Sequence, residues 1–153
     1  MRCGVTAGPI DVAALLAAVA DPACGAVVLF LGNVRDAHGG RAVAGIRYDG
    51  YRPMAEAVLQ RLGEELESAH GVRLAIVHRL GELAVGETSV AIAAASPRRD
   101  AAFAATRAAL ERLKKELPVW KLERYADGTS AWREEERLAP REAAGAPGAP
   151  EPR

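Results

Sequence analysis

The chain has 153 residues, half of them hydrophobic. This length and composition suffice for one compact domain with a buried core, but the chain is short for two domains. Twenty Lys and Arg residues balance twenty Asp and Glu residues, so no net positive charge attracts nucleic acid or an anionic membrane. Aromatic residues make up only 5% of the chain, so platforms for stacking bases are scarce. Any anion site must therefore come from a local group of cations.

The cysteines and the lack of long apolar runs indicate the compartment. Cys3 and Cys24 have neither a CxxC spacing nor a His-rich partner segment, so the sequence predicts no zinc site and no disulfide framework. No apolar run approaches the ~20 residues that cross a bilayer, and the N-terminus lacks the features of a signal peptide. We expect a cytoplasmic protein.

The first third of the chain predicts one helix and two strands. Asp11 can cap a short helix over residues 12–20. Residues 25–31 form a continuous apolar run between turn signals, which predicts a buried central strand. Residues 43–51 predict the next strand.

The middle of the chain repeats this order of helix and strands. A helix begins near Pro53, carries apolar residues at intervals of four and ends at Gly71. Two strands follow over residues 72–79 and 88–95, with residues 81–86 as their connection.

The last third predicts a long helix, two strands and a tail. The helix covers residues 97–116, with Phe103, Leu110, Leu113 and Leu117 near one buried stripe. A strand over residues 119–125 follows, with Lys121 and Glu123 on one face and Trp120 and Leu122 on the other. A short strand through Trp132 comes next. The mixture of helices and hairpins favours an α+β fold. We expect a single domain over residues 1–138 and a disordered tail rich in Pro, Ala and Gly over residues 139–153.

Two lysines lie on either side of a proline turn. Lys114 is near the end of the long helix and Lys121 is just inside the next strand, with Pro118 between them. A helix that meets a strand at such a turn can bring both ammonium groups to one cleft, where a desolvated amine can exchange protons or act as a nucleophile. The alternative is that Lys114 lies along the helix surface and Lys121 faces solvent.

Two arginines open the same helix, and a third follows the first strand. Arg98 and Arg99 lie at the end of the helix that carries the positive pole of its dipole, and a bound anion there would remove the charge conflict. Guanidinium groups hold phosphate or carboxylate oxygens two at a time. Arg35 follows a strand and Gly32, a place where site residues often lie. For all three arginines, ordinary solvent exposure is the alternative.

Five ordered blocks of residues resemble one known family. They are Phe30-Leu-Gly-Asn-Val-Arg35, Tyr48-Asp-Gly-Tyr51 through Met54, His78-Arg-Leu-Gly-Glu-Leu83, Ser96-Pro-Arg-Arg99 to Phe103, and Leu113-Lys114 to Pro118-Val-Trp-Lys121. In this order and spacing they resemble the large (catalytic) subunit of molybdopterin synthase over about residues 10–133.

The resemblance implies an α/β-hammerhead fold with a small additional antiparallel β-subdomain. It also implies a homodimer flanked by two copies of a small ubiquitin-like sulfur carrier, forming a heterotetramer. The implied reaction transfers two sulfurs from the C-terminal thiocarboxylate of the carrier to cyclic pyranopterin monophosphate, which gives the dithiolene of molybdopterin. The large subunit of this family is expected to need no metal and no other cofactor.

The resemblance also implies roles for individual residues. Lys114 and Lys121 match the two active-site lysines, and Arg35 matches the arginine after the Gly-x-Val motif. Arg99 matches the arginine of the anion pocket, either of its own subunit or of the neighbouring one. The family often has His at the position of Arg98, and we assign Arg98 to binding only, because arginine does not release its proton in proteins. Phe30 and Leu110 are expected to form apolar wall near the pocket.

Two other classes of function compete with this reading. A non-catalytic module could use the same basic cleft to hold a phosphorylated metabolite or an acidic peptide. A nucleic-acid-binding protein is disfavoured by the zero net charge and the few aromatic residues.

Overall fold

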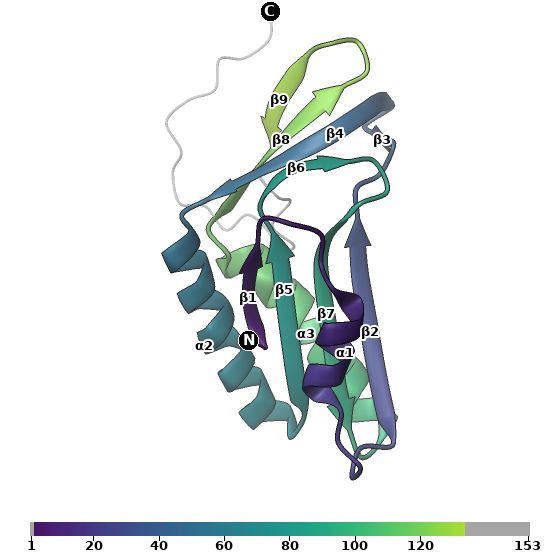
Figure 1. The fold of residues 1–153 in the computed structure, drawn as a ribbon, viewed down its shortest axis with the longest axis vertical. Coiled ribbons are helices and arrows are strands. Elements are labelled where there is room, and N and C mark those ends of the chain that lie inside the picture. The colour runs from purple at the N-terminus through teal and green to yellow at the C-terminus, as the bar shows by residue number, and fades with distance from the viewer. Residues whose placement is uncertain (1, 134–153) are drawn as a thin grey trace, which may run out of the picture.

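The computed structural model describes residues 2–133, which form two sheets and three helices (Figure 1). In chain order the elements are β1 (Cys3–Thr6), α1 (Val12–Val19), β2 (Ala26–Asn33), β3 (Ala37–His38), β4 (Arg41–Gly50), α2 (Arg52–His70), β5 (Arg73–Arg79), β6 (Gly81–Ala84), β7 (Thr88–Ser96), α3 (Arg99–Glu116), β8 (Val119–Tyr125) and β9 (Ser130–Arg133). This arrangement confirms the α+β prediction. The predicted tail, 139–153, lies outside the described residues, as does the end of the predicted domain.

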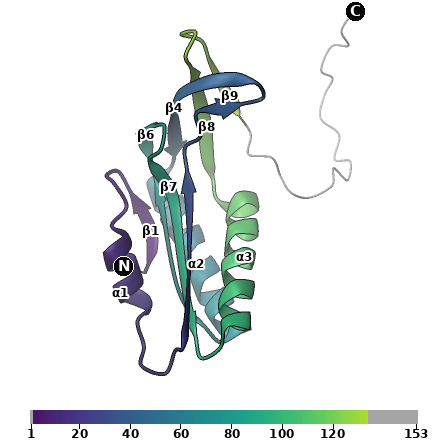
Figure 2. The same ribbon diagram turned by 90° about the vertical axis from the view of Figure 1, so that its right-hand side faces the viewer.

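The larger sheet has the strand order β1-β5-β7-β2, with β1 parallel to β5 and the other pairs antiparallel. Helices α2 and α3 cover one face of this sheet, and α1 packs on β5 and β7 from the other face (Figure 2). The main core lies between the sheet and the two long helices. Its fully buried side chains include Leu59, Leu62, Ile76 and Ile92.

The smaller sheet is the antiparallel β-subdomain that the resemblance implies. Strands β3, β4, β8 and β9 lie in that order, and β6 pairs with β4. This sheet has a small core of its own, built around Val43, Ile46, Leu83 and Tyr125. Because β8 follows α3 directly, the subdomain lies at the end of the molecule where α3 finishes (Figure 2).

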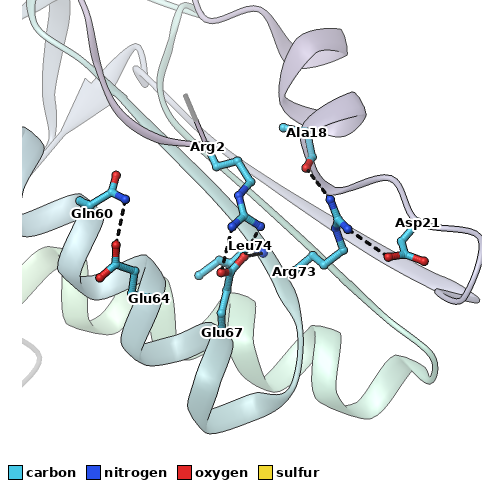
Figure 3. A network of polar contacts seen from close by, with 8 residues as sticks. All are labelled: Arg2, Ala18, Asp21, Gln60, Glu64, Glu67, Arg73 and Leu74. Atoms are coloured by element: carbon cyan, nitrogen blue, oxygen red, sulfur yellow. Dashed lines mark hydrogen bonds and ion pairs between the residues drawn. The ribbon is translucent and has the colours of Figure 1, made fainter.

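Local interactions explain several element boundaries. The backbone N–H of Ala14 donates to Asp11 Oδ1 at 2.9 Å, which confirms the predicted cap of α1. Gly71 ends α2 with a φ of 63°, a conformation that disfavours side chains with a Cβ. Near that end Glu67 accepts hydrogen bonds from Arg2 and from the backbone of Leu74, which joins α2 to the N-terminal segment and to β5 (Figure 3).

The prediction that residues 25–31 form a buried central strand is wrong in its position. β2 lies at the edge of the larger sheet, and among the described residues it pairs only with β7. Its side chains alternate, so Val27, Leu29 and Leu31 are exposed on the face of the sheet that carries α1. A continuous apolar run in a strand does not reveal whether another element of the same chain covers both faces of that strand. Here α1 packs over β5 and β7 and leaves one face of β2 uncovered.

The predicted buried stripe of α3 is also partly wrong. Leu113 is buried as expected, but Phe103 is exposed, and the helix instead buries Ala102, Ala105 and Ala109 against the sheet. Small side chains let a helix approach a sheet closely, so they mark the packed face better here than the large ones do. The short strands β1, β3 and β6 were not predicted.

Candidate active site

Lys121 projects from β8 into the space enclosed by the β-subdomain. Strand alternation places it on the same face as Glu123, as the sequence predicts, and its Nζ lies 3.7 Å from Glu123 Oε1. The Lys121 side chain is only 19% exposed. It is therefore a partly desolvated cation with one carboxylate partner rather than a side chain in open solvent.

Glu123 is a buried carboxylate surrounded by cations. It is 1% exposed, and its Oε1 also lies 3.3 Å from Nδ1 of His38. Its Oε2 accepts a hydrogen bond from the Tyr125 hydroxyl at 2.9 Å and lies 3.4 Å from Nε of Arg133. Burial acts to raise the pKa of Glu123, but the Tyr125 hydrogen bond and the charges of His38, Lys121 and Arg133 hold it below its usual value. The site thus has a fixed negative centre.

A cavity of about 40 Å³ lies beside these groups. Asn33, Arg35, Ala37, His38, Val43, Ile46, Tyr48, Lys121 and Glu123 line it. Arg35 comes from the segment between β2 and β3, so the end of the larger sheet and the β-subdomain both contribute to the wall. The structure brings together Arg35 and Lys121, two of the predicted site residues.

Lys114 lies in the last turn of α3, at the junction with β8, and is partly buried. The helix ends at Glu116 and β8 begins at Val119, so both predicted lysines come from this junction. Lys114 does not line the cavity beside Lys121. The shared cleft expected for the two lysines is therefore not formed by that cavity.

Arg98 and Arg99 lie at the opposite end of α3. Arg98 is the residue before the first turn, both arginines are exposed, and Asp100 in the first turn supplies the negative charge that the helix dipole favours. A helix of 18 residues is about 27 Å long, so these guanidinium groups are far from Lys114 and Lys121 of the same chain. One protomer alone does not bring all five predicted cations together.

The free cations stand out because so many others are paired. Within residues 2–133, thirteen of the fifteen ion pairs involve an arginine, yet no hydrogen bond or ion pair is made by the side chains of Arg35, Arg98, Arg99 or Lys114. Four of the five cations predicted for the site are thus available to bind anions.

The family model of the MoaE protein matches residues 5–116, from β1 to the end of α3. The chain belongs to the MoaE family. The molybdopterin synthase catalytic subunit 1 of Mycobacterium tuberculosis is 42% identical over 127 residues, which cover 82% of this chain and 86% of that protein. The molybdopterin synthase catalytic subunit of Culex quinquefasciatus is 42% identical over 134 residues, covering 85% of each chain.

A solved structure shares the MoaE fold of this chain. The crystal structure of molybdopterin synthase from Staphylococcus aureus superposes with a TM-score of 0.83 at 34% identity, covering 87% of this chain and 97% of that chain. These comparisons confirm the predicted family and the predicted fold class. They place the chain among the catalytic subunits of an enzyme of molybdenum cofactor biosynthesis.

Phe30 and Leu110, predicted as pocket wall, have a different setting in this MoaE chain. Both are partly buried against the main core on the side of the larger sheet that α3 covers, and neither lines the cavity beside Lys121. If they form apolar wall, it belongs to the surface near α3 and not to this cavity.

Sequence reasoning missed His38, Tyr125 and Arg133 as partners of Glu123. Glu123 itself could have been found, because it lies two residues from Lys121 in a predicted strand and must share its face. His38 lies in a strand of two residues, which is too short to give a periodic signal. His78, near the end of β5, is buried and has its Nδ1 2.9 Å from the carbonyl oxygen of Arg79.

None of the helices within residues 2–133 is long and apolar enough to cross a membrane.

Proposed function

We propose that this chain transfers sulfur from the C-terminal thiocarboxylate of a small ubiquitin-like carrier subunit to cyclic pyranopterin monophosphate. The product is the dithiolene of molybdopterin. The observation that carries the proposal is the set of free cations in a chain that belongs to the MoaE family. Thiocarboxylate and phosphate are both anions, and fixed positive charge offsets their mutual repulsion.

The proposed site is shared between two subunits. Arg35, Lys114 and Lys121 come from one protomer, and the partner subunit's Arg98 and Arg99 complete the anion pocket. The length of α3 supports this division, because about 27 Å separates its two ends. The exposed Val27, Leu29 and Leu31 on edge strand β2 provide an apolar surface of the kind that a homodimer covers.

Each cation has a proposed role that follows from its setting. Arg35, Arg98 and Arg99 bind the phosphate of the substrate and the thiocarboxylate of the carrier, because guanidinium groups bind such oxygens in pairs. Lys121 and Lys114 stabilise the oxyanion that develops during transfer and exchange protons with it. Removing one such donor commonly costs about 3 kcal/mol of transition-state stabilisation. The carrier's tail reaches these lysines at the junction of α3 and β8.

The test is a reconstituted reaction. The purified chain is mixed with a thiocarboxylated carrier and cyclic pyranopterin monophosphate, and the dithiolene product is sought by mass spectrometry. We expect product and a carrier tail converted to a carboxylate. If a known molybdopterin synthase forms product under the same conditions and this chain does not, the proposal is wrong.

A further inference from the structure

The cavity beside Lys121 contains an imidazole with no role in the sulfur transfer described so far. His38 lies on β3, and its side chain is 31% exposed. Its Nδ1 is 3.3 Å from Glu123 Oε1, the same oxygen that lies 3.7 Å from Nζ of Lys121. The imidazole and the ammonium group therefore share one acceptor at the cavity wall.

Glu123 lies next to one ring nitrogen of this imidazole. The second oxygen of Glu123 is engaged by the Tyr125 hydroxyl and by Arg133, so the carboxylate is fixed by contacts on both oxygens. A fixed carboxylate next to Nδ1 selects the tautomer with the proton on Nδ1 and leaves Nε2 as the basic nitrogen.

The surroundings of the imidazole suit a water molecule. A cavity of about 40 Å³ has room for a water, and its wall offers polar groups on His38, Lys121, Glu123 and Arg35. The charged groups that face His38 are Glu123 and Lys121 from β8 and Arg35 from the segment after β2. Arg133 of β9 lies behind Glu123, and Arg41, opposite His38 in the hairpin, is paired with Asp127.

Sulfur transfer requires a water at some step. If only the sulfur of a thiocarboxylate moves to the substrate, the carrier's carbonyl carbon must exchange that sulfur for an oxygen. Once the sulfur has bonded to a substrate carbon, the carrier and the substrate are joined as a thioester. Water is the simplest source of the oxygen that separates them.

We propose that His38 is the general base for this hydrolysis, an assignment that rests on the proposed sulfur transfer. Nε2 of His38 takes a proton from the water as its oxygen bonds to the thioester carbonyl carbon. The carbon–sulfur bond of the thioester then breaks, which leaves the sulfur on the substrate as a thiolate. The carrier departs with a C-terminal carboxylic acid, which loses its proton to solvent, and His38 returns its proton to solvent.

Three variants separate this role from a structural one. His38→Asn keeps an N–H donor near the position of Nδ1 and so preserves the contact with Glu123, but it has no basic nitrogen. His38→Ala removes both and leaves space for added imidazole. His70→Asn, at the end of α2 and away from the cavity, is the matched control.

The experiment measures single-turnover product formation against pH and the mass of the carrier during the reaction. We expect H38N to be about 100-fold slower than wild type, with a covalent adduct of carrier and substrate accumulating and the acid limb of the pH profile lost. Imidazole should accelerate H38A, and H70N should match wild type.

The outcomes also separate this proposal from the proposed function. If wild type forms dithiolene and H38N forms it at the same rate with the same pH profile, the role of His38 is wrong and the sulfur transfer stands. If H38N is slow but no adduct accumulates and imidazole does not rescue H38A, His38 is not the base. If wild type forms no product at all, the sulfur transfer itself is wrong.

Discussion

At the scale of single residues, Lys114 and Lys115 offer a direct comparison. The two lysines are adjacent in the last turn of α3, but Lys114 is partly buried and Lys115 is exposed. We expect Lys114→Ala to lower the rate of dithiolene formation by about 100-fold or more, because a positioned cation near the developing oxyanion is lost. Lys115→Ala should keep the wild-type rate. Turnover and carrier affinity measured together provide the check.

A binding module would behave differently in that comparison. If Lys114→Ala weakened carrier or substrate binding in proportion to the lost charge and left turnover of the bound complex unchanged, Lys114 would serve binding alone. Equal effects of the two substitutions would remove any special role for Lys114.

His78 gives a prediction about stability and pH. Burial lowers the pKa of His78 to about 4 from an ordinary value of 6.5, although a hydrogen bond to the carbonyl of Arg79 acts in the opposite direction. Because the folded pKa lies below the unfolded one, the unfolded chain binds the proton first as pH falls from about 6.5 to about 4, and stability falls with it. Between about pH 7 and pH 5 the loss should be about 2 kcal/mol.

The variant His78→Phe tests this dependence of the free energy of unfolding on pH. Phenylalanine keeps a ring for the edge-to-face contact with Tyr48 but does not titrate. Urea unfolding should show a free energy of unfolding that depends less on pH in H78F than in wild type. His70→Gln should keep the wild-type slope, and an unchanged slope in H78F would mean that another group is responsible.

The contact between single residues that the sequence could predict depended on the regular alternation of side chains along a strand. The shared face of Lys121 and Glu123 follows from strand periodicity and is confirmed. His38 reaches Glu123 only because the hairpin of β3 and β4 folds beside β8. No local sequence pattern predicts that this hairpin and β8 are neighbours. Contacts of this kind depend on tertiary structure and were therefore not predicted.

At the scale of elements, the exposed apolar face of edge strand β2 predicts where the homodimer interface lies. Leu29 is 37% exposed on the uncovered face of β2, and Val85, after β6, is 39% exposed on a different part of the surface. We expect Leu29→Glu to convert a dimer to a monomer, because burying an unpaired carboxylate in an apolar interface is costly. Sedimentation measures the mass of each species.

Val85→Glu is the matched control, since it places the same charge at a site of similar exposure. It should leave the dimer intact, and circular dichroism should show both variants folded. A dimeric L29E would show that β2 is not at the interface between subunits.

The elements themselves were mostly predictable, and the errors share a cause. The helix capped by Asp11 and the helix ended by Gly71 carry their boundaries in local chemistry. The exposure of one face of β2 depends on which strands α1 covers, and the buried face of α3 depends on how closely the helix approaches the sheet. Which faces are buried is decided by packing between elements that are far apart in the sequence.

At the scale of the whole molecule, the proposed site is divided between two subunits. The sequence suggested a pocket where α3 begins and where it ends, yet those two ends are about 27 Å apart. The two ends of α3 can serve one site only if two subunits each contribute one end. The family and the fold could be predicted from ordered motifs, and the resemblance already left open that Arg99 serves the neighbouring subunit. The length of α3 in the structure is what favours this division.

The most direct measurement of this claim mixes two inactive variants. Lys121→Ala and Arg99→Ala are each expected to be nearly inactive as homodimers. After subunits exchange in an equal mixture, half of the dimers should be heterodimers, and each should contain one intact site. Dithiolene formation should then recover to about a quarter of the wild-type rate. If exchange is demonstrated and the mixture stays inactive, Arg99 and Lys121 do not act across the subunit interface, and the account of a shared site is contradicted.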